Sequence, residues 1–222
     1  HVGFMGCHAA LNALRVARAF AVAAPNAVVL VGAVEVCSIH LAYGWQPEVL
    51  VGNALFADGA AAAIVSAHHD TNAPNDAPPA LRLIDHASAV IPGSADAMTW
   101  AITDHGFRMT LSPRVPDFVR QRLDAFLTPW LERHGLTTQA IAAWAVHPGG
   151  PQVLAAARDA LALPEAATQA SAHTLRHLGN MSSPTVMFIL DRLTRATPAP
   201  PRGPVVALAF GPGLTIEAAL LH

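Results

Sequence analysis

Lysine is absent from this chain of 222 residues, and all 13 basic residues are arginine. Without a lysine amine, the chain cannot form a Schiff base with a substrate or with pyridoxal phosphate, and it cannot complete a P-loop. The 15 acidic residues bring the net charge to −2, so the bulk positive charge that binds nucleic acid is also missing. Charged residues make up 13% of the chain and hydrophobic residues 53%, which excludes a disordered chain.

Cysteines and long apolar runs are also scarce. Cys7 and Cys37 are the two cysteines, whereas a secreted disulfide scaffold would carry more of them at closer spacing. We expect two reduced thiols, although a single Cys7–Cys37 bridge is compatible with the sequence. The richest apolar stretches, 27–34 and 205–210, have the length of buried strands and not of membrane spans. We therefore expect a cytoplasmic protein that binds neither membrane nor nucleic acid.

Helical and strand patterns alternate along the chain. Helices are predicted at 8–24, 116–134 and 152–161 and from the turn at 177–183 to about residue 194. The apolar run 27–34 predicts a strand buried on both faces, and 60–67 is a second buried run. Further strands are predicted at 81–90 and 141–146, and two closing apolar runs flank Gly211, Pro212 and Gly213. This alternation indicates a mixed α/β fold with a largely buried sheet.

Three residues have the chemistry that acyl transfer needs. Cys7 directly precedes a predicted helix, where the helix dipole lowers a thiol pKa. His147 ends a predicted strand and is followed by Pro-Gly-Gly-Pro, which lets a ligand approach the backbone. Asn180 stands at the entry to a helix. Taken singly, these residues are a packed cysteine, a structural histidine and a helix cap; together they offer a nucleophile, a base and an amide donor.

One family built on this order of residues is the papain-like cysteine peptidases. Their histidine follows the cysteine after about 130–150 residues, an interval that His147 satisfies. However, the Cys-Gly-Ser-Cys-Trp signature is absent, and no tryptophan follows Asn180. A metal enzyme is not indicated either, because the chain has no His-Glu-x-x-His pattern. The peptidase stays the weaker alternative.

Five ordered motifs resemble the type III polyketide synthases, the chalcone synthase-like branch of the thiolase superfamily. They are Gly6-Cys7 with its helix, the segment 49–60 (Val-Leu-Val-Gly-Asn-Ala-Leu-Phe-Ala-Asp-Gly-Ala), His-Pro-Gly-Gly-Pro at 147–151, Gly-Asn-Met-Ser-Ser at 179–183, and Phe-Gly-Pro-Gly-Leu-Thr-Ile-Glu at 210–217. The resemblance extends over essentially the whole chain. It implies a cytoplasmic acyltransferase that condenses malonyl-CoA units, with loss of CO2, onto an acyl starter and makes a small aromatic or pyrone polyketide.

The resemblance also assigns roles to the three residues. Cys7 matches the nucleophile that carries the acyl chain. His147 and Asn180 match the pair that polarises the malonyl thioester and holds the oxyanion, and a His147 imidazolium would keep Cys7 as a thiolate. The implied partners are two CoA thioesters, malonyl-CoA and an acyl-CoA starter, with no metal or organic cofactor.

The substrate cavity is assigned in the same way. Phe56 matches the gatekeeper phenylalanine, and Met109 stands where the family has its second one. Trp100 stands where plant enzymes have a glycine, and Cys37 and His40 where they have threonines, which favours a bacterial type with small acyl starters. The remaining matching positions are Gly52, Leu111, Gly149, Gly150, Ser182, Gly211, Pro212 and Gly213.

The implied fold is a thiolase-like αβαβα layered structure of two similar halves, assembled as a homodimer. Residues 1–67 match the remainder of the N-terminal half with its nucleophile, 68–80 a linker, and 81–222 the C-terminal half. Most of the first half is expected to precede His1. A truncated, non-catalytic thiolase-fold chain is therefore an alternative to the enzyme.

Overall fold

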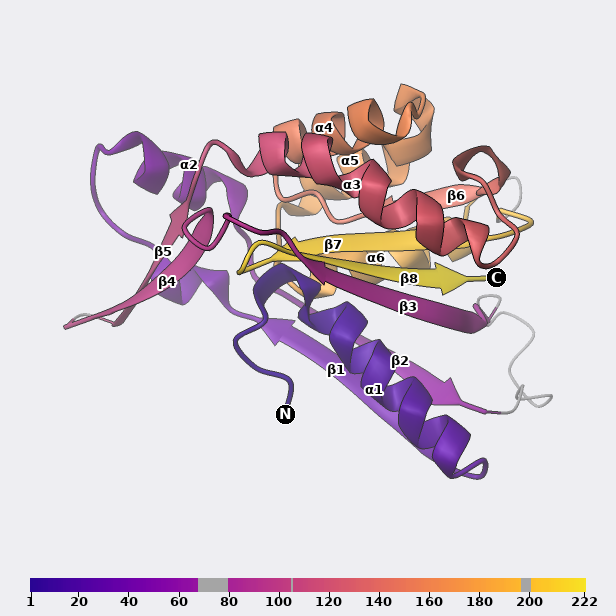
Figure 1. Ribbon diagram of the computed structural model, residues 1–222. Coiled ribbons are helices and arrows are strands. Elements are labelled where there is room, and N and C mark those ends of the chain that lie inside the picture. Colours follow the sequence, from indigo (N-terminus) through magenta and orange to yellow (C-terminus); the bar gives the residue numbers. More distant parts are fainter. Residues whose placement is uncertain (68–79, 105, 197–200) are drawn as a thin grey trace.

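The computed structural model describes residues 1–67, 80–104, 106–196 and 201–222. Its helices are α1 (Ala9–Ala23), α2 (Pro47–Leu55), α3 (Val115–Glu132), α4 (Pro151–Leu161), α5 (Gln169–Leu178) and α6 (Pro184–Thr194). Its strands are β1 (Val28–Glu35), β2 (Gly59–Ser66), β3 (Leu83–Val90), β4 (Met98–Thr103), β5 (Gly106–Leu111), β6 (Ala143–Val146), β7 (Val205–Gly211) and β8 (Thr215–Leu221). In Figure 1, helices α3 and α4 lie above the sheet containing β7 and β8, and helix α1 and the β1–β2 pair lie below it.

The central sheet has the strand order β3-β8-β7-β6. Strands β6 and β7 are parallel, with Val146 opposite Leu208, and the other pairs are antiparallel. Every residue of β6, β7 and β8 is buried. The closing apolar runs are therefore strands covered on both faces, as the sequence predicts.

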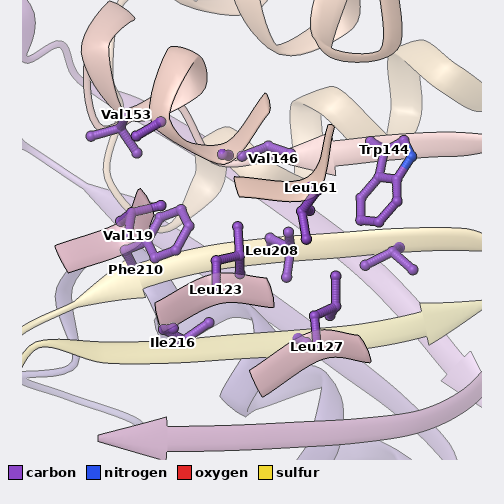
Figure 2. Close-up of a cluster of buried hydrophobic side chains, with 14 of the residues drawn as sticks. Val119, Leu123, Leu127, Trp144, Val146, Val153, Leu161, Leu208, Phe210 and Ile216 are labelled. Carbon is purple, nitrogen blue, oxygen red and sulfur yellow. The ribbon is translucent and has the colours of Figure 1, made fainter. Parts of the chain in front are cut away.

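Helices cover both faces of this sheet. Alternate residues of β7 and β8, such as Leu208 and Ile216, face α3 and α4, where they join Leu123, Leu127 and Val153 in one core (Figure 2). The intervening residues, such as Ala207 and Ala219, face α1 and α6 in a second core. Because side chains alternate between the two faces of the sheet, both cores include residues of β7 and β8. Packing on both faces therefore fixes the register of these strands.

The β1–β2 pair is buried on one face only, so the prediction of complete burial is wrong for both strands. Val31 and Ala33 pack towards α1, whereas Val28, Leu30 and Val34 are exposed. The residues of β2 also alternate in exposure. A run of apolar residues indicates strand length, but which faces are covered depends on the layers packed against it, and α1 and α6 pack against one face here.

Four elements are absent from the sequence prediction. Helix α2 occupies a segment that reads only as a short apolar run, strands β4 and β5 form a hairpin with Trp100 opposite Met109, and α5 precedes the 179–183 motif. Helix α5 buries the small polar residues Ser171 and Thr174, so its sequence lacks the large apolar stripe by which a helix is recognised.

Residues 68–79 of the predicted linker lie outside the described residues, so the division into 1–67 and 81–222 stays a prediction. None of the helices in the described part of the chain has the length and apolarity needed to cross a membrane.

Candidate active site

Cys7 lies in a single 3-10 turn, Gly6–His8, that leads into α1 and packs on β7. Gly6 has φ +59°, a conformation that residues with a side chain rarely adopt. A Cβ atom at Gly6 would lie 3.3 Å from Cδ of Pro212. The glycine therefore allows both the turn and its close approach to the loop.

Burial dominates the electrostatics of Cys7, whose side chain is 8% exposed. Loss of solvation raises the pKa of the Cys7 thiol to about 12, while hydrogen bonding to the side chains of Ser182 and Asn180 acts in the opposite direction. The charge of Glu35 adds to the increase. The expectation of a lowered Cys7 pKa is therefore wrong, because burial of the thiol raises the pKa.

Asn180 is fixed between α5 and α6 by its backbone. Its N–H donates to Leu55 O at 2.9 Å, and its carbonyl accepts from Ala57 N–H at 2.9 Å, so it forms a parallel bridge with Phe56. The side-chain Oδ1 accepts the Ser182 N–H at 2.9 Å. Asn180 is not the cap of α6, a position that Ser183 occupies. With Oδ1 engaged, the Nδ2 amide remains as the donor of this buried side chain.

His147 follows β6, and its N–H donates to Leu208 O at 2.7 Å. The side chain is 1% exposed, and neither ring nitrogen has a hydrogen-bond partner among the described residues. Burial, followed by a charge interaction with His8, lowers the pKa of His147 to about 3. An imidazolium–thiolate pair with Cys7, which the sequence suggests, is therefore disfavoured in this structure, and both groups are neutral. A buried imidazole without partners requires an explanation, and a ligand supplies one.

The structure brings the three residues to the same end of the central sheet. Cys7 interacts with Asn180 directly. His147 is linked to Cys7 through His8, the next residue along the chain, with which it interacts electrostatically. The arrangement offers a thiol, a neutral imidazole and an amide donor in a site that excludes water, which suits attack on a thioester and stabilisation of an oxyanion.

Four rings from separate segments form an aromatic cluster beside this site: Phe4, His40, Trp100 and Phe107. Trp100 lies 5.0 Å from His40 and makes a T-shaped contact of 6.3 Å with Phe107, which lies 6.4 Å from Phe4 between ring centroids. Phe4 has φ 62°, which is strained for a bulky residue. The cluster connects the segment before Cys7, the turn Cys37–His40 and the β4–β5 hairpin.

Other predicted cavity residues occupy neighbouring elements. Phe56 ends α2 beside Asn180, and a Cβ at Gly52 in the same helix would meet no atom within 4 Å. Burial raises the pKa of the half-buried Cys37 to about 11, and Cys37 and Cys7 are both free thiols. The hairpin carries Met109 and Leu111, which lie opposite Trp100 and Met98.

The remaining predicted residues lie in loops around Cys7 and His147. Gly149 and Gly150 connect His147 to α4, and Ser182, with φ 56°, follows Asn180. Gly211 is the last residue of β7, and Pro212 and Gly213 lie in the loop that leads to β8. A Cβ at Gly211 would lie 2.8 Å from Met5 O, so the end of β7 touches the residues before the nucleophile.

Sequence reasoning missed three polar residues here. His8 is buried beside Cys7. Glu35 raises the pKa of both cysteines, and Ser183 Oγ donates to Glu35 Oε1 at 2.7 Å. His8 could have been found from its adjacency to Cys7, whereas the Glu35–Ser183 contact joins residues 148 apart and needs the fold. In the described ranges, His, Cys, Asp and Glu side chains form no group of three or more that could hold a metal ion.

Comparisons with known proteins agree with this architecture. A family model described as chalcone and stilbene synthases, N-terminal domain, matches residues 1–69, and the corresponding C-terminal domain matches residues 82–222. The 1,3,6,8-tetrahydroxynaphthalene synthase of Streptomyces peucetius subsp. caesius is 37% identical over 199 residues, which cover 89% of this chain and 52% of that protein.

Solved structures give the same result. PKS-I from the brown alga Ectocarpus siliculosus superposes with a TM-score of 0.90 at 32% identity, over 99% of this chain and 59% of its own. The 1,3,6,8-tetrahydroxynaphthalene synthase of Streptomyces coelicolor A3(2), a bacterial type III polyketide synthase, gives a TM-score of 0.88 at 30% identity, over 98% of this chain and 60% of its own. This chain thus spans between half and three fifths of the length of these relatives. The predicted thiolase-like α/β fold is confirmed, and the peptidase alternative finds no support. The chain belongs to the chalcone and stilbene synthase family, the type III polyketide synthases.

Proposed function

We propose that this chain carries the reaction centre of an acyltransferase that extends a Cys7-bound acyl group with malonyl-CoA. The observation that supports it most is His147, a buried imidazole with two unpartnered ring nitrogens at the sheet end where Cys7 meets Asn180. An imidazole in that state lacks hydrogen-bond partners, and a thioester oxygen or a thiol proton would supply one.

In the first step, the Cys7 sulfur attacks the carbonyl carbon of the starter thioester. Because burial keeps Cys7 as a thiol and His147 neutral, His147 accepts the thiol proton as a general base during attack. The Asn180 Nδ2 amide donates to the oxyanion. The bond from the acyl carbon to the CoA sulfur then breaks, and CoA leaves with the proton that His147 accepted.

In the second step, malonyl-CoA loses CO2, and the electron pair of the broken carbon–carbon bond forms an enolate. Donors from His147 and Asn180 at the enolate oxygen stabilise it by a few kcal/mol, in the range of about 3–4 for one lost donor. The enolate carbon attacks the Cys7 thioester, a new carbon–carbon bond forms, and the Cys7 sulfur leaves as a thiolate. This thiolate then takes up a proton from solvent. The elongated chain is then a CoA thioester that can reacylate Cys7.

The test is incubation of the full-length polypeptide with labelled malonyl-CoA and a small acyl-CoA starter. We expect CO2 release and a polyketide in the wild type, and no polyketide from Cys7→Ala. Asn180→Ala should lose decarboxylation as well as condensation. A Cys7→Ala variant that still makes the polyketide would refute the mechanism, and a well-folded wild type with neither product would favour the non-catalytic alternative.

We also propose the predicted homodimer. Every second residue from Ile39 to Trp45, namely Ile39, Leu41, Tyr43 and Trp45, is an exposed large apolar side chain, and such a patch supports an interface. Sedimentation of the wild type and of Trp45→Glu tests this assembly, which predicts that the variant shifts towards monomer. The cytoplasmic location stays a prediction that rests on two free thiols.

A further inference from the structure

His8 is a buried titratable residue that the reaction proposed above does not use. It follows Cys7 directly, closes the 3-10 turn and starts α1, and it is 4% exposed. Packing alone does not require a polar side chain at a buried position, because an apolar side chain could fill the same space.

Asn12, one turn along α1, determines the tautomer of His8. Its Nδ2 lies 2.6 Å from His8 Nδ1 and 3.3 Å from His8 O. The carbonyl oxygen can only accept, so Asn12 must present its amide N–H groups towards His8. His8 Nδ1 is therefore the acceptor of the shorter hydrogen bond, and the ring proton of the neutral imidazole resides on Nε2.

The opposite edge of the same ring lies against the end of β7. A Cβ at Gly211 would be 1.7 Å from His8 Cδ2 and 2.4 Å from His8 Nε2, so the imidazole fills the space of a side chain at that position. On the other side of Cys7, Gly6 lies against Pro212. The residues flanking the nucleophile thus pack on Gly211 at the end of β7 and on Pro212, which follows it. The hydrogen bond with Asn12 fixes the orientation of the His8 ring in this contact.

Strand β7 also locates His147. Val146 pairs with Leu208, and the His147 N–H donates to Leu208 O. The position of Cys7 relative to His147 therefore depends on how the Cys7 turn docks on β7. The His8 ring, held by Asn12, is one of the contacts of this docking, and its charge interaction with His147 is consistent with their proximity.

We propose that His8 is a positioning residue: with its ring fixed by the hydrogen bond from Asn12 and seated against Gly211, it places Cys7 relative to His147 for proton transfer. The inference rests on the proposed function. It predicts that His8 and Asn12 act through one shared interaction and change the rate of Cys7 acylation more than the affinity for the thioester.

A double-mutant cycle in the full-length polypeptide tests this proposal. His8→Phe keeps the ring and loses the acceptor, Asn12→Leu keeps the imidazole and loses the donor, and the double variant loses both. The rate of Cys7 acylation by acetyl-CoA is measured by intact mass spectrometry over a range of acetyl-CoA concentrations, together with Tm. His177→Phe, at an exposed histidine of α5, is the matched control.

Each single variant should lower the maximal acylation rate by about tenfold or more, because displacements of about 1 Å can cost on the order of 100-fold. The acetyl-CoA concentration that gives half of the maximal rate should change little. The double variant should be acylated no more slowly than the slower single variant. His177→Phe should match the wild type.

Wild-type rates in both single variants would overturn the proposal, as would additive losses or losses that merely follow Tm. If His8→Phe fails to fold, Asn12→Leu decides alone, because Asn12 is only partly buried. A folded wild type that acetyl-CoA and malonyl-CoA both fail to acylate would refute the proposed function itself. If the wild type is acylated and the His8 and Asn12 variants are acylated at the same rate, only the role of His8 is refuted.

Discussion

Replacing Gly211 with alanine inserts one methyl group where the Cys7 turn meets β7. The new Cβ would lie 1.7 Å from His8 Cδ2 and 2.8 Å from Met5 O. Carbon atoms in contact lie about 3.5–4.0 Å apart, so the His8 ring must move by about 2 Å. Met5 O belongs to the backbone and cannot rotate away, so the turn that carries Cys7 must move with the ring.

The expected cost has two parts. Overpacking a well-packed site typically destabilises a protein by about 1–3 kcal/mol. For a chain of this length, each kcal/mol lowers Tm by about 2–4 °C, which gives a decrease of about 2–12 °C. The displaced Cys7 should also be acylated at least about tenfold more slowly, since misplacement by about 1 Å can cost on the order of 100-fold.

Thermal unfolding and the rate of Cys7 acylation by acetyl-CoA measure these two effects in the same samples. Gly32→Ala in β1 is the matched control, because its Cβ would meet nothing within 4 Å. We expect the control to keep the wild-type rate with an unchanged or slightly higher Tm. A Gly211→Ala variant that behaves like Gly32→Ala would refute the close contact between His8 and β7.

Three further results are expected. Burial lowers the His147 pKa from 6.5 to about 3, so the folded state holds this histidine neutral between these pH values, whereas the unfolded chain binds the proton. The free energy of unfolding should therefore fall as the pH drops from 6.5 to about 3, by up to about 1.4 kcal/mol per pH unit per buried histidine. Denaturant titrations at several pH values should show this slope, and His147→Gln should flatten it; an unchanged slope in the variant would contradict the assignment. Glu35→Gln removes a charge that raises the Cys7 pKa, so Cys7 alkylation by iodoacetamide at pH 8.5 should become faster, and an equal or slower rate would contradict this electrostatic effect. Phe107→Ala removes the ring that contacts Trp100 edge-on and should shift the preference among acyl-CoA starters towards longer chains, measured as relative acylation rates; the exposed Phe20→Ala is the control, and identical preferences in the two variants would exclude the aromatic cluster from the acyl site.

The sequence predicts the central sheet better than the outer layers. The run at β7 is apolar throughout, and the run at β8 is apolar apart from Thr215 and Glu217. Helices cover both faces of these strands, so their pattern reports their burial directly. The run at β1 has the same composition, but Leu30 and Val34 are exposed. Local sequence carries strand propensity, whereas coverage of a face is set by residues distant in the chain.

The candidate site divides in the same way. Cys7, His147 and Asn180 stand in motifs whose glycines and neighbours can be recognised one segment at a time, and the prediction that these residues catalyse the reaction awaits its test. The prediction of a lowered Cys7 pKa is wrong because a helix N-terminus is visible in sequence, whereas the burial that raises the pKa depends on how the whole chain folds around the thiol. The tautomer of His8 likewise depends on geometry that only the folded chain provides.

The central claim is that Cys7 accepts an acyl group from a CoA thioester with the help of His147 and Asn180. The most direct measurement is intact-mass and peptide analysis of the full-length polypeptide after brief exposure to acetyl-CoA, for the wild type, Cys7→Ser, His147→Gln and Asn180→Ala. The account predicts a single acetyl adduct on Cys7, formed fastest in the wild type and on the order of 100-fold more slowly without the Asn180 donor. An adduct located on Cys37, or equal rates of Cys7 acylation in the wild type, His147→Gln and Asn180→Ala, would contradict it.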